Sequence, residues 1–433
     1  MNARLILTRL LVALWVVGLF VLLAGFAIDR HLRAAPDDWA TTVRIGPFER
    51  RWQVASAMRL ATRPGVARLL SGRTSSTSYG TWRLEREPGV LRATCAPCVL
   101  RASALGAAPL RLTRVTIDVE RVEHDDYAGR LWIGRDANAL PLAWRARLDP
   151  RGLVLDVNAT ALPIATLLEA VEPRLPELAR AHIEGTLSLT LRYGGDPSMA
   201  RGDLASRLRF EPRLEGFSVT GLGTEVLLSA TPPERCGPAT APLRGWLPLA
   251  VLAAEDQTFF SHAGVDLDTL RGALLTNAAS ESILGGSTLT QQLAKLVYTG
   301  DHRDPVRKLR EMLYAVEMER TLGKGRILQL YLAIAPWGSG LCGAEQASRH
   351  YFGKAAARLD PLEAAWLAGL LRNPDAALQA IAEDRCIDAR RTAWVLSQMR
   401  PMASWRKVYW SARVDALQPA GALPSGAKPS TNR

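Results

Sequence analysis

Hydrophobic and polar residues alternate with a period of two through much of the chain between about residues 41 and 229. Residues 115–119 and 187–191 each place Val, Ile or Leu at every second position, with charged or hydroxyl residues between them. This pattern predicts half-buried strands. The sequence Asp-Pro-Arg-Gly at 149–152 has the chemistry of a hairpin turn. We therefore predict an antiparallel sheet, with one covering helix at about 164–179.

The pattern becomes helical after a boundary at residues 231–238, where three prolines and a glycine fall within eight positions. Such a cluster interrupts both the strand period and the helix period. Prolines and capping residues then predict where three helices begin and end. These helices are expected at about 248–258, 305–322 and 361–371.

Residues 10–28 form an uncharged apolar stretch of nineteen residues. At 1.5 Å per residue, a helix of this length crosses the hydrocarbon core of a membrane. A cleaved signal peptide is the alternative, but no clear cleavage site follows residues 23–27. We expect an uncleaved anchor. Arg4 and Arg9 precede it and favour a cytoplasmic amino terminus, which places the rest of the chain outside.

The chain carries 54 Lys and Arg residues against 42 Asp and Glu residues, a net charge of +12. A basic surface suits anionic lipid headgroups, a pyrophosphate or nucleic acid. No nucleic-acid motif with interleaved aromatic residues is present, so the membrane is the expected partner and nucleic acid is not.

The chain has five cysteines. Cys95 and Cys98 form a C-x-x-C pair, which suits a redox pair, half of a zinc site or a small disulfide loop. No second C-x-x-C completes a metal site, and a disulfide is the default in an oxidising compartment. One of the five cysteines stays unpaired or bonds to another chain.

Residues 255–266 place two adjacent carboxylates, two phenylalanines, a histidine and a glycine directly after an apolar run. Taken alone, this segment is more often a helix end with a solvated Glu-Asp pair. Four further motifs follow within the next hundred residues, in the order GGSTLTQQLAK (285–295), RKLRE (307–311), RILQLYL (326–332) and GAEQASRHYFGK (343–354).

In this order the five motifs resemble those of the peptidoglycan glycosyltransferases, lysozyme-like enzymes that polymerise lipid II into glycan strands. The resemblance covers about residues 243–399, and the loop at 335–340 is most similar to the monofunctional biosynthetic subgroup. It implies a mainly helical, lysozyme-like domain. Two S-x-x-K sequences, at 404–407 and 425–428, lack the K-T-G partner of a transpeptidase, so no peptide cross-linking is expected.

The resemblance implies two catalytic residues, Glu255 as the base and Glu311 across the cleft. It also implies that Lys295 and Arg303 hold the pyrophosphate of the donor. His262 and Asp266 are expected to shape the turn instead of touching substrate. The predicted substrate-binding residues are Asp256, Phe259, Gly286, Ser287, Thr288, Gln291, Gln292, Lys295, Arg303, Arg307 and Lys308.

A polar stripe on one helix supports part of this set, because Thr288, Gln291, Gln292 and Lys295 are spaced i, i+3, i+4 and i+7. Ser287 is expected to cap that helix, and the glycines before it are expected to let the backbone approach a ligand.

The implied reaction is an inverting transfer. A sugar 4-hydroxyl attacks the anomeric carbon of the donor and expels undecaprenyl pyrophosphate. No metal site is predicted and no cofactor is required, although Mg²⁺ or Mn²⁺ at the pyrophosphate is compatible with this chemistry. The implied partners are lipid II, the growing glycan, the membrane and other cell-wall synthesis proteins. The implied location is the bacterial inner membrane, with a single span and a periplasmic catalytic domain.

The sequence departs from the family pattern at three positions, Leu296, Gln329 and Ala333. These departures favour a second hypothesis, an inactive cell-wall scaffold that acts through the β-rich region. A lysozyme-like hydrolase is a third hypothesis, but it would not need a pyrophosphate clamp.

We therefore expect a multidomain chain: an N-terminal transmembrane helix, a β-rich α+β middle domain and a mainly α lysozyme-like glycosyltransferase domain. The expected divisions are an anchor at 1–33, a β-rich domain of unassigned role at 41–230, a glycosyltransferase domain at 240–412 and a disordered tail at 413–433.

Overall fold

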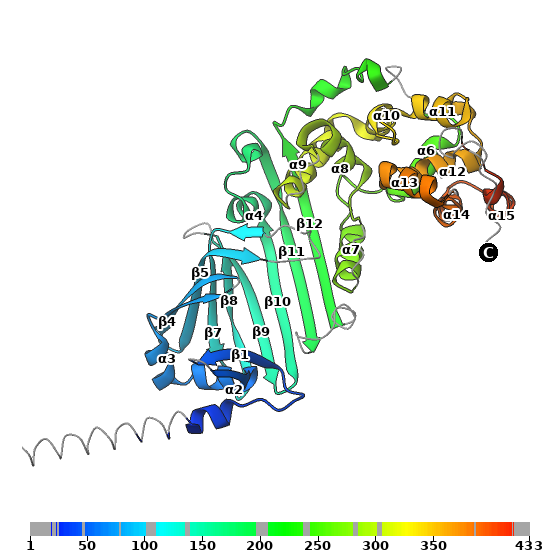
Figure 1. Ribbon diagram of the computed structural model, residues 1–433. Helices are drawn as coiled ribbons and strands as arrows, with labels where there is room; N and C mark the ends of the chain where they lie inside the picture. The colour runs from blue at the N-terminus through cyan, green and yellow to red at the C-terminus, as the bar shows by residue number, and fades with distance from the viewer. Residues whose placement is uncertain are drawn as a thin grey trace, which may run out of the picture.

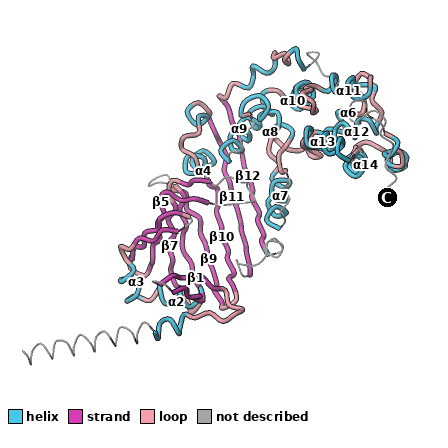
Figure 2. The backbone as a smooth tube through the Cα atoms, viewed as in Figure 1, coloured by secondary structure: helices cyan, strands magenta, loops and turns pink. Residues whose placement is uncertain are grey.

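The computed structural model places a large sheet before a helical region (Figures 1 and 2). No helix among the residues it describes is both long enough and apolar enough to cross a membrane. The expected anchor at 10–28 lies mostly outside these residues, as do Arg303 and most of the expected tail. The described residues are 19, 23, 26–45, 48–77, 79–100, 110–134, 139–195, 207–236, 243–279, 285–300, 305–384, 387–417 and 419.

The described residues contain a 10-stranded antiparallel sheet in the order β12-β11-β10-β9-β8-β7-β5-β4-β3, with β6 paired to β5. The predicted hairpin is confirmed, because Asp149 pairs with Gly152 across its turn. A separate ribbon of β1 (Ala40–Ile45) and β2 (Phe48–Gln53) lies near the amino-terminal end. The strands of the large sheet are β3 (Thr74–Thr77), β4 (Gly80–Glu87), β5 (Val90–Leu100), β6 (Leu110–Leu112), β7 (Val115–Arg121), β8 (Asp126–Ile133), β9 (Leu140–Asp149), β10 (Gly152–Pro163), β11 (His182–Gly195) and β12 (Leu208–Thr220).

One face of the sheet is apolar and the other is polar, as the alternating sequence requires. Trp144, Val157, Leu191 and Phe210 pair in register across four neighbouring strands and therefore share one face. Their neighbours along each strand, such as Arg192, point to the opposite face. The apolar face must be covered by something, because water wets it poorly.

Two short helices cover parts of the apolar face. Helix α4 (Ile164–Val171) packs on Leu140, Leu142 and Leu162, and α2 (Val54–Ala61) packs on Tyr127 and Leu148. The single helix expected at 164–179 was wrong in length, because the helix ends at Val171 and a separate 3₁₀ turn, η3, follows at Pro176–Ala179. The alternating pattern also gave no signal for α2 or for α3 (Pro64–Leu70).

The second half is helical, as predicted. The Asp360 side chain caps α12 in a capping box with Glu363, as expected. Helix α6 ends at Glu255, three residues before the expected end, because residues 256–264 form a tight loop. Val414 is buried in the helical core, so ordered structure continues past residue 412. The helices are α6 (Leu247–Glu255), α7 (Leu267–Ala279), α8 (Leu289–Ala294), α9 (Pro305–Thr321), α10 (Gly323–Ile334), α11 (Ala344–Phe352), α12 (Pro361–Leu370), α13 (Pro374–Asp384), α14 (Ala389–Gln398) and α15 (Ser404–Ser411).

The sheet and the helices share one hydrophobic core. Leu168 of α4 and Val219 of β12 belong to the same buried cluster as Leu247 and Leu313 of the helical region. Polar contacts strengthen this junction, because the Arg310 guanidinium on α9 donates to the buried Glu177 carboxylate at 2.8 Å. The two halves therefore pack as one body at this end of the sheet.

Glu317 of α9 is a buried polar group of the junction that accepts several hydrogen bonds. Its side chain accepts hydrogen bonds from the backbone N–H groups of Leu222 at 2.7 Å, Gly223 at 3.0 Å and Thr224 at 3.3 Å. The residue is only 2% exposed. A buried carboxylate is stable only when its hydrogen-bonding capacity is filled, and here the chain that leaves β12 fills it.

Two disulfides form among the described residues. Cys95 bonds to Cys98, which confirms the small-loop alternative for the C-x-x-C pair. Cys236 bonds to Cys342 and closes a loop across 106 positions, tying the segment before the helical region to the loop after α10. The fifth cysteine, Cys386, lies outside the described residues.

Glu317→Ala is expected to lower the free energy of unfolding by about 2–4 kcal/mol, because three N–H groups near the junction lose their charged acceptor. Arg320→Ala is the matched control, since Arg320 is exposed on the same helix. Denaturant unfolding of both variants measures the difference. A loss for Glu317→Ala no greater than that of the control would show that the junction does not depend on this carboxylate.

Candidate active site

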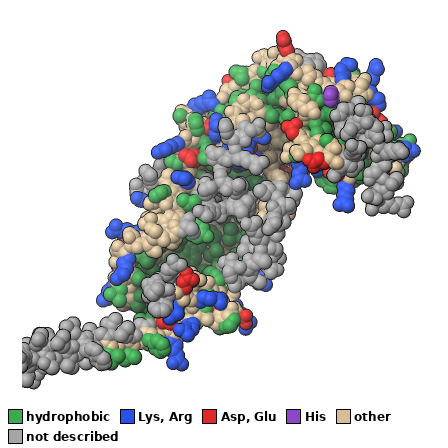
Figure 3. Space-filling view, viewed as in Figure 1, with side chains coloured by type: hydrophobic (Ala, Val, Ile, Leu, Met, Phe, Trp, Pro, Cys, Tyr) green, Lys and Arg blue, Asp and Glu red, His purple; other side chains and the backbone are tan. Residues whose placement is uncertain are grey.

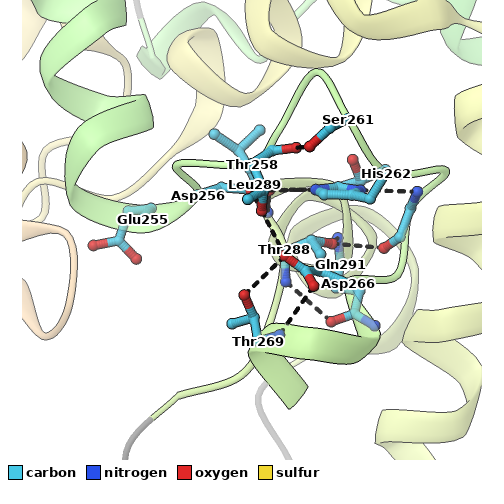
Figure 4. Close-up of polar contacts among 12 residues, drawn as sticks. Glu255, Asp256, Thr258, Ser261, His262, Asp266, Thr269, Thr288, Leu289 and Gln291 are labelled. Carbon is cyan, nitrogen blue, oxygen red and sulfur yellow. Dashed lines mark hydrogen bonds and ion pairs between the residues drawn. The ribbon is translucent and has the colours of Figure 1, made fainter. Parts of the chain in front are cut away.

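The candidate site begins where α6 ends and the chain reverses through the loop at residues 256–264. The Asp256 carboxylate accepts the backbone N–H of Leu289, the first residue of α8, at 2.8 Å. It also lies 3.0 Å from Nε2 of His262, and His262 Nδ1 accepts the N–H of Gly264 at 3.1 Å. Asp256 therefore holds the loop closed and fixes the start of α8 beside the end of α6 (Figure 4).

The start of α8 is built by a capping box. Thr288 accepts the N–H of Gln291, and the Gln291 side chain accepts the N–H of Thr288. The cap is therefore Thr288, not Ser287 as predicted. Gly286 packs tightly on α7, because a Cβ there would meet Ala273 at 3.0 Å and Leu270 at 3.3 Å, and its approach to a ligand stays a prediction. Gly286 lets this segment approach α7 closely.

Glu255 points away from this network, as Figure 4 shows. Gln292 Nε2 donates to Glu255 Oε2 at 2.9 Å, and the amide of Gln292 is itself oriented by Tyr331, whose hydroxyl donates to it at 2.8 Å. A nitrogen of Arg391 lies 3.4 Å from Glu255 Oε1. Burial raises the pKa of Glu255, and the hydrogen bond from Gln292 and the charges of Arg391 and Arg372 oppose that rise only in part.

Glu311 lies on α9 with two cations around it. Arg307 and Lys308 both donate to its carboxylate, Lys308 at 2.9 Å. Glu311 is 3% exposed, so its charge is neutralised inside the protein and not by solvent. Burial lowers the pKa of Lys308, the carboxylate of Glu311 opposes this, and the charges of Arg307 and Lys295 lower it further. These four residues therefore act on one another electrostatically.

A cavity of about 340 Å³, the Glu255 cavity, lies beside these two groups. Glu255 and Ser287 both line it, and the Lys308 ammonium donates to the Ser287 hydroxyl. The Glu311 cluster thus reaches the cavity wall through Lys308 and Ser287. The cavity lining therefore contains a carboxylate with a raised pKa and a hydroxyl that contacts the cation cluster.

Several predicted contact residues lie inside the protein instead. Phe259 is 1% exposed and packs beneath Lys324, whose ammonium lies 4.4 Å from its ring centre. Gln291 is buried in the helix cap. Asp256 and Thr288 line the Glu255 cavity, but their polar side-chain atoms are already bonded within the protein. All four residues hold the site in place through contacts within the protein. Phe259 and Gln291 are buried away from the cavity lining, whereas Asp256 and Thr288 line it. That any of the four touches substrate stays a prediction.

Of the other predicted residues, four lie in the site and Arg303 lies outside the described residues. Gln292, Ser287, Arg307 and Lys308 belong to the two groups described above. Asp266 shapes the turn as predicted, since it accepts the Thr269 N–H at 2.9 Å at the start of α7.

Sequence reasoning missed two residues of α14. Arg391 donates to the Ala254 carbonyl at 3.1 Å as well as approaching Glu255, and its guanidinium lies 4.6 Å from the ring centre of Trp394. Trp394 lines the Glu255 cavity and is partly exposed. No local motif marks them, because α14 reaches the site from more than 130 positions away in the sequence.

Comparison with known proteins places the site in a family. The transglycosylase family model matches residues 240–400. Biosynthetic peptidoglycan transglycosylase of Shewanella frigidimarina is 43% identical over 163 residues, which cover 36% of this chain and 69% of that relative. The chain belongs to the transglycosylase family.

Two further relatives are also named biosynthetic peptidoglycan transglycosylase. The protein of Shewanella oneidensis is 42% identical over 156 residues, covering 36% of this chain and 66% of the relative. The protein of Aeromonas hydrophila is 44% identical over 153 residues, covering 35% and 64%. The chain thus spans just under two thirds of the length of these two relatives. The matched region is the helical one, a peptidoglycan glycosyltransferase domain, and the large sheet lies outside it.

The three departures from the family pattern differ in burial: Ala333 is buried, Gln329 is half-buried and Leu296 is exposed. Gln329 accepts a hydrogen bond from Arg326 at 2.9 Å, and Arg326 also donates to the carbonyls of Leu227 and Ala230. Gln329 therefore supports the junction with the chain that follows β12.

The raised pKa of Glu255 has a consequence for stability. Between the ordinary pKa of a glutamate and the raised value, the folded state binds more protons than the unfolded state, so stability falls as the pH rises. Glu255→Gln removes this effect. The variant should be more stable than wild type near neutral pH, and the gain should vanish as the pH falls through the ordinary pKa.

Denaturant midpoints from about pH 4 to about pH 8 measure this difference. Glu383→Gln is the control, because Glu383 is exposed on α13. A gain for Glu255→Gln that does not change with pH would contradict the assigned burial effect.

Proposed function

We propose that this transglycosylase polymerises lipid II into glycan strands, releases undecaprenyl pyrophosphate and has no transpeptidase activity. One observation carries the proposal: a cavity lined by a largely buried carboxylate of raised pKa, Glu255, and by Ser287, which accepts a hydrogen bond from Lys308 of the cation cluster. The reaction needs a base for a sugar hydroxyl and positive charge for a pyrophosphate. The names of the matched relatives support the same chemistry.

Glu255 acts as the general base in this mechanism. The attacking 4-hydroxyl transfers its proton to the carboxylate as the new glycosidic bond forms. A raised pKa makes the carboxylate a stronger proton acceptor. Gln292 and Arg391 fix its orientation through the contacts described above, and Gln292 is fixed in turn by Tyr331.

The leaving pyrophosphate needs charge neutralisation more than a proton. Arg307 and Lys308, held in place by the buried Glu311, supply preorganised positive charge next to the Ser287 wall of the Glu255 cavity. Lys295 and Arg303 extend this clamp. Glu311 therefore organises cations instead of transferring a proton. No cofactor is required in this mechanism, and Mg²⁺ or Mn²⁺ at the pyrophosphate oxygens is compatible with it.

The same proposal sets the location of the protein. Residues 10–28 anchor it in the bacterial inner membrane, and the glycosyltransferase domain acts on the periplasmic side, where lipid II, the growing glycan and other cell-wall proteins meet it. Leu23, Phe26 and Ile28 are all exposed, which is costly in water and is relieved in a lipid environment.

Purified protein given lipid II tests the proposal. Wild type should form long glycan strands, Glu255→Gln should be slower by a factor on the order of 10² to 10⁴, and Glu311→Asp should retain more activity than Glu311→Gln. Exposed Glu383→Gln is again the control. No product from folded wild type would favour the scaffold hypothesis, and cleavage of preformed strands alone would favour a hydrolase.

The anchor has its own test. Removal of residues 1–25 keeps Asp29 and Leu32, which contact the rest of the protein, and should release the protein from membranes into soluble extracts. Fractionation of cells with an antibody to the chain measures this. If the full-length protein is processed so that it begins after Ala27, the anchor proposal fails.

A further inference from the structure

The apolar face of the sheet is only partly covered by the described helices. One buried cluster lies under α4 and another lies under α2. Leu155, Leu191 and Phe210 share the apolar face, are half-buried, and belong to neither cluster. Figure 3 shows hydrophobic side chains lining a hollow over this part of the molecule.

This face leads directly to the candidate active site. A second cavity of about 730 Å³, the sheet-side cavity, is lined by Leu214 and Phe217 of β12 and by nine residues between 258 and 269, among them His262, Asp266 and Asp268. Leu214 pairs with Leu187 in register and lies four residues from Phe210, so it belongs to the same apolar face. The sheet-side cavity shares Thr258, Asp266 and Thr269 with the Glu255 cavity.

The other end of the face lies near the amino-terminal segment. Trp52 of β2 donates to Asp29 at 3.1 Å, and Arg33 forms a β-bridge with Trp52. The exposed apolar residues Phe26 and Ile28 precede this contact. In Figure 1 this segment lies at the end of the sheet opposite the helical domain. A strand of fourteen residues such as β11 spans about 46 Å between these two ends.

A lipid-linked substrate would therefore have to bridge this distance. If the amino-terminal segment is in the membrane, the Glu255 cavity lies far from it, while the hydrocarbon tail of the substrate cannot cross water without a large cost. The central residues of the face offer hydrocarbon and no charge. A flexible aliphatic chain needs no hydrogen-bond partners, whereas a peptide backbone laid there would need partners that these side chains do not offer.

We propose that the apolar face of the sheet, from Leu155 through Leu191 and Phe210 to Leu214, binds the polyprenyl chain of the lipid-linked donor. The sugar pyrophosphate then lies in the Glu255 cavity, and the chain passes along the Leu214 and Phe217 side of the sheet-side cavity. The sheet becomes the lipid-binding part of the enzyme. This inference rests on the proposed function, because it assumes a lipid-linked sugar as substrate.

Photocrosslinking tests the contact without adding charge to the face. A benzophenone amino acid replaces Leu191 or, as the matched control, the neighbouring Thr190, which points to the opposite face. The full-length protein is mixed with vesicles that contain undecaprenyl pyrophosphate with a radioactive label. Labelled protein is expected for position 191 and not for position 190. Equal labelling at both positions, or a crosslink from 191 only to protein, overturns the proposal.

Enzyme assays separate this inference from the proposed function. Leu191→Glu and the control Thr190→Glu are each assayed on lipid II in vesicles and on a water-soluble lipid II with a short chain. The ratio of the first rate to the second should fall at least about fivefold for Leu191→Glu and stay at the wild-type value for Thr190→Glu, because a carboxylate repels hydrocarbon. An unchanged ratio overturns the lipid face, whereas wild type inactive on both substrates overturns the proposed function.

Discussion

The buried contact between Glu317 and the backbone of residues 222–224 decides how the sheet meets the helices. A carboxylate inside a protein demands hydrogen-bond donors, and only the segment that follows β12 supplies them here. Glu311 lies on the same helix, six residues earlier, about 9 Å along the axis and about 120° around it. Helix α9 therefore presents one buried carboxylate to the sheet and another to the cation cluster of the site.

Burial also sets the chemistry of the site. Glu311 is buried and Glu255 is largely buried at the cavity wall, but their neighbours differ. Gln292 offers Glu255 a neutral hydrogen bond, so desolvation prevails and raises the pKa of the carboxyl group. Glu311 has Arg307 and Lys308 as partners, so its charge is balanced by two cations. A glutamate side chain thus suits proton transfer at position 255 and the positioning of cations at position 311.

Apolar and polar residues alternate along the strands of the large sheet, as in an ordinary half-buried sheet. Its apolar face, however, packs against several separate elements. Helices α2 and α4 cover two regions of it, and the helical domain covers its end at Val219. A sheet with a wholly covered face would be a separate domain with its own core. Here the core of the transglycosylase domain continues onto the sheet, and the remaining apolar surface is the part available to a ligand.

The sequence by itself determined the elements and the family. The two-residue period of 187–191 requires a strand with one apolar face, the Asp360 and Glu363 pair specifies a helix start, and the ordered motifs identify the glycosyltransferase domain. These are local signals, carried by neighbouring residues. Only the tertiary structure decided that Phe259 packs in the core, that Thr288 and not Ser287 caps α8, and that Arg391 approaches Glu255. Those outcomes depend on contacts between distant segments, whose packing and desolvation are not encoded in any short pattern.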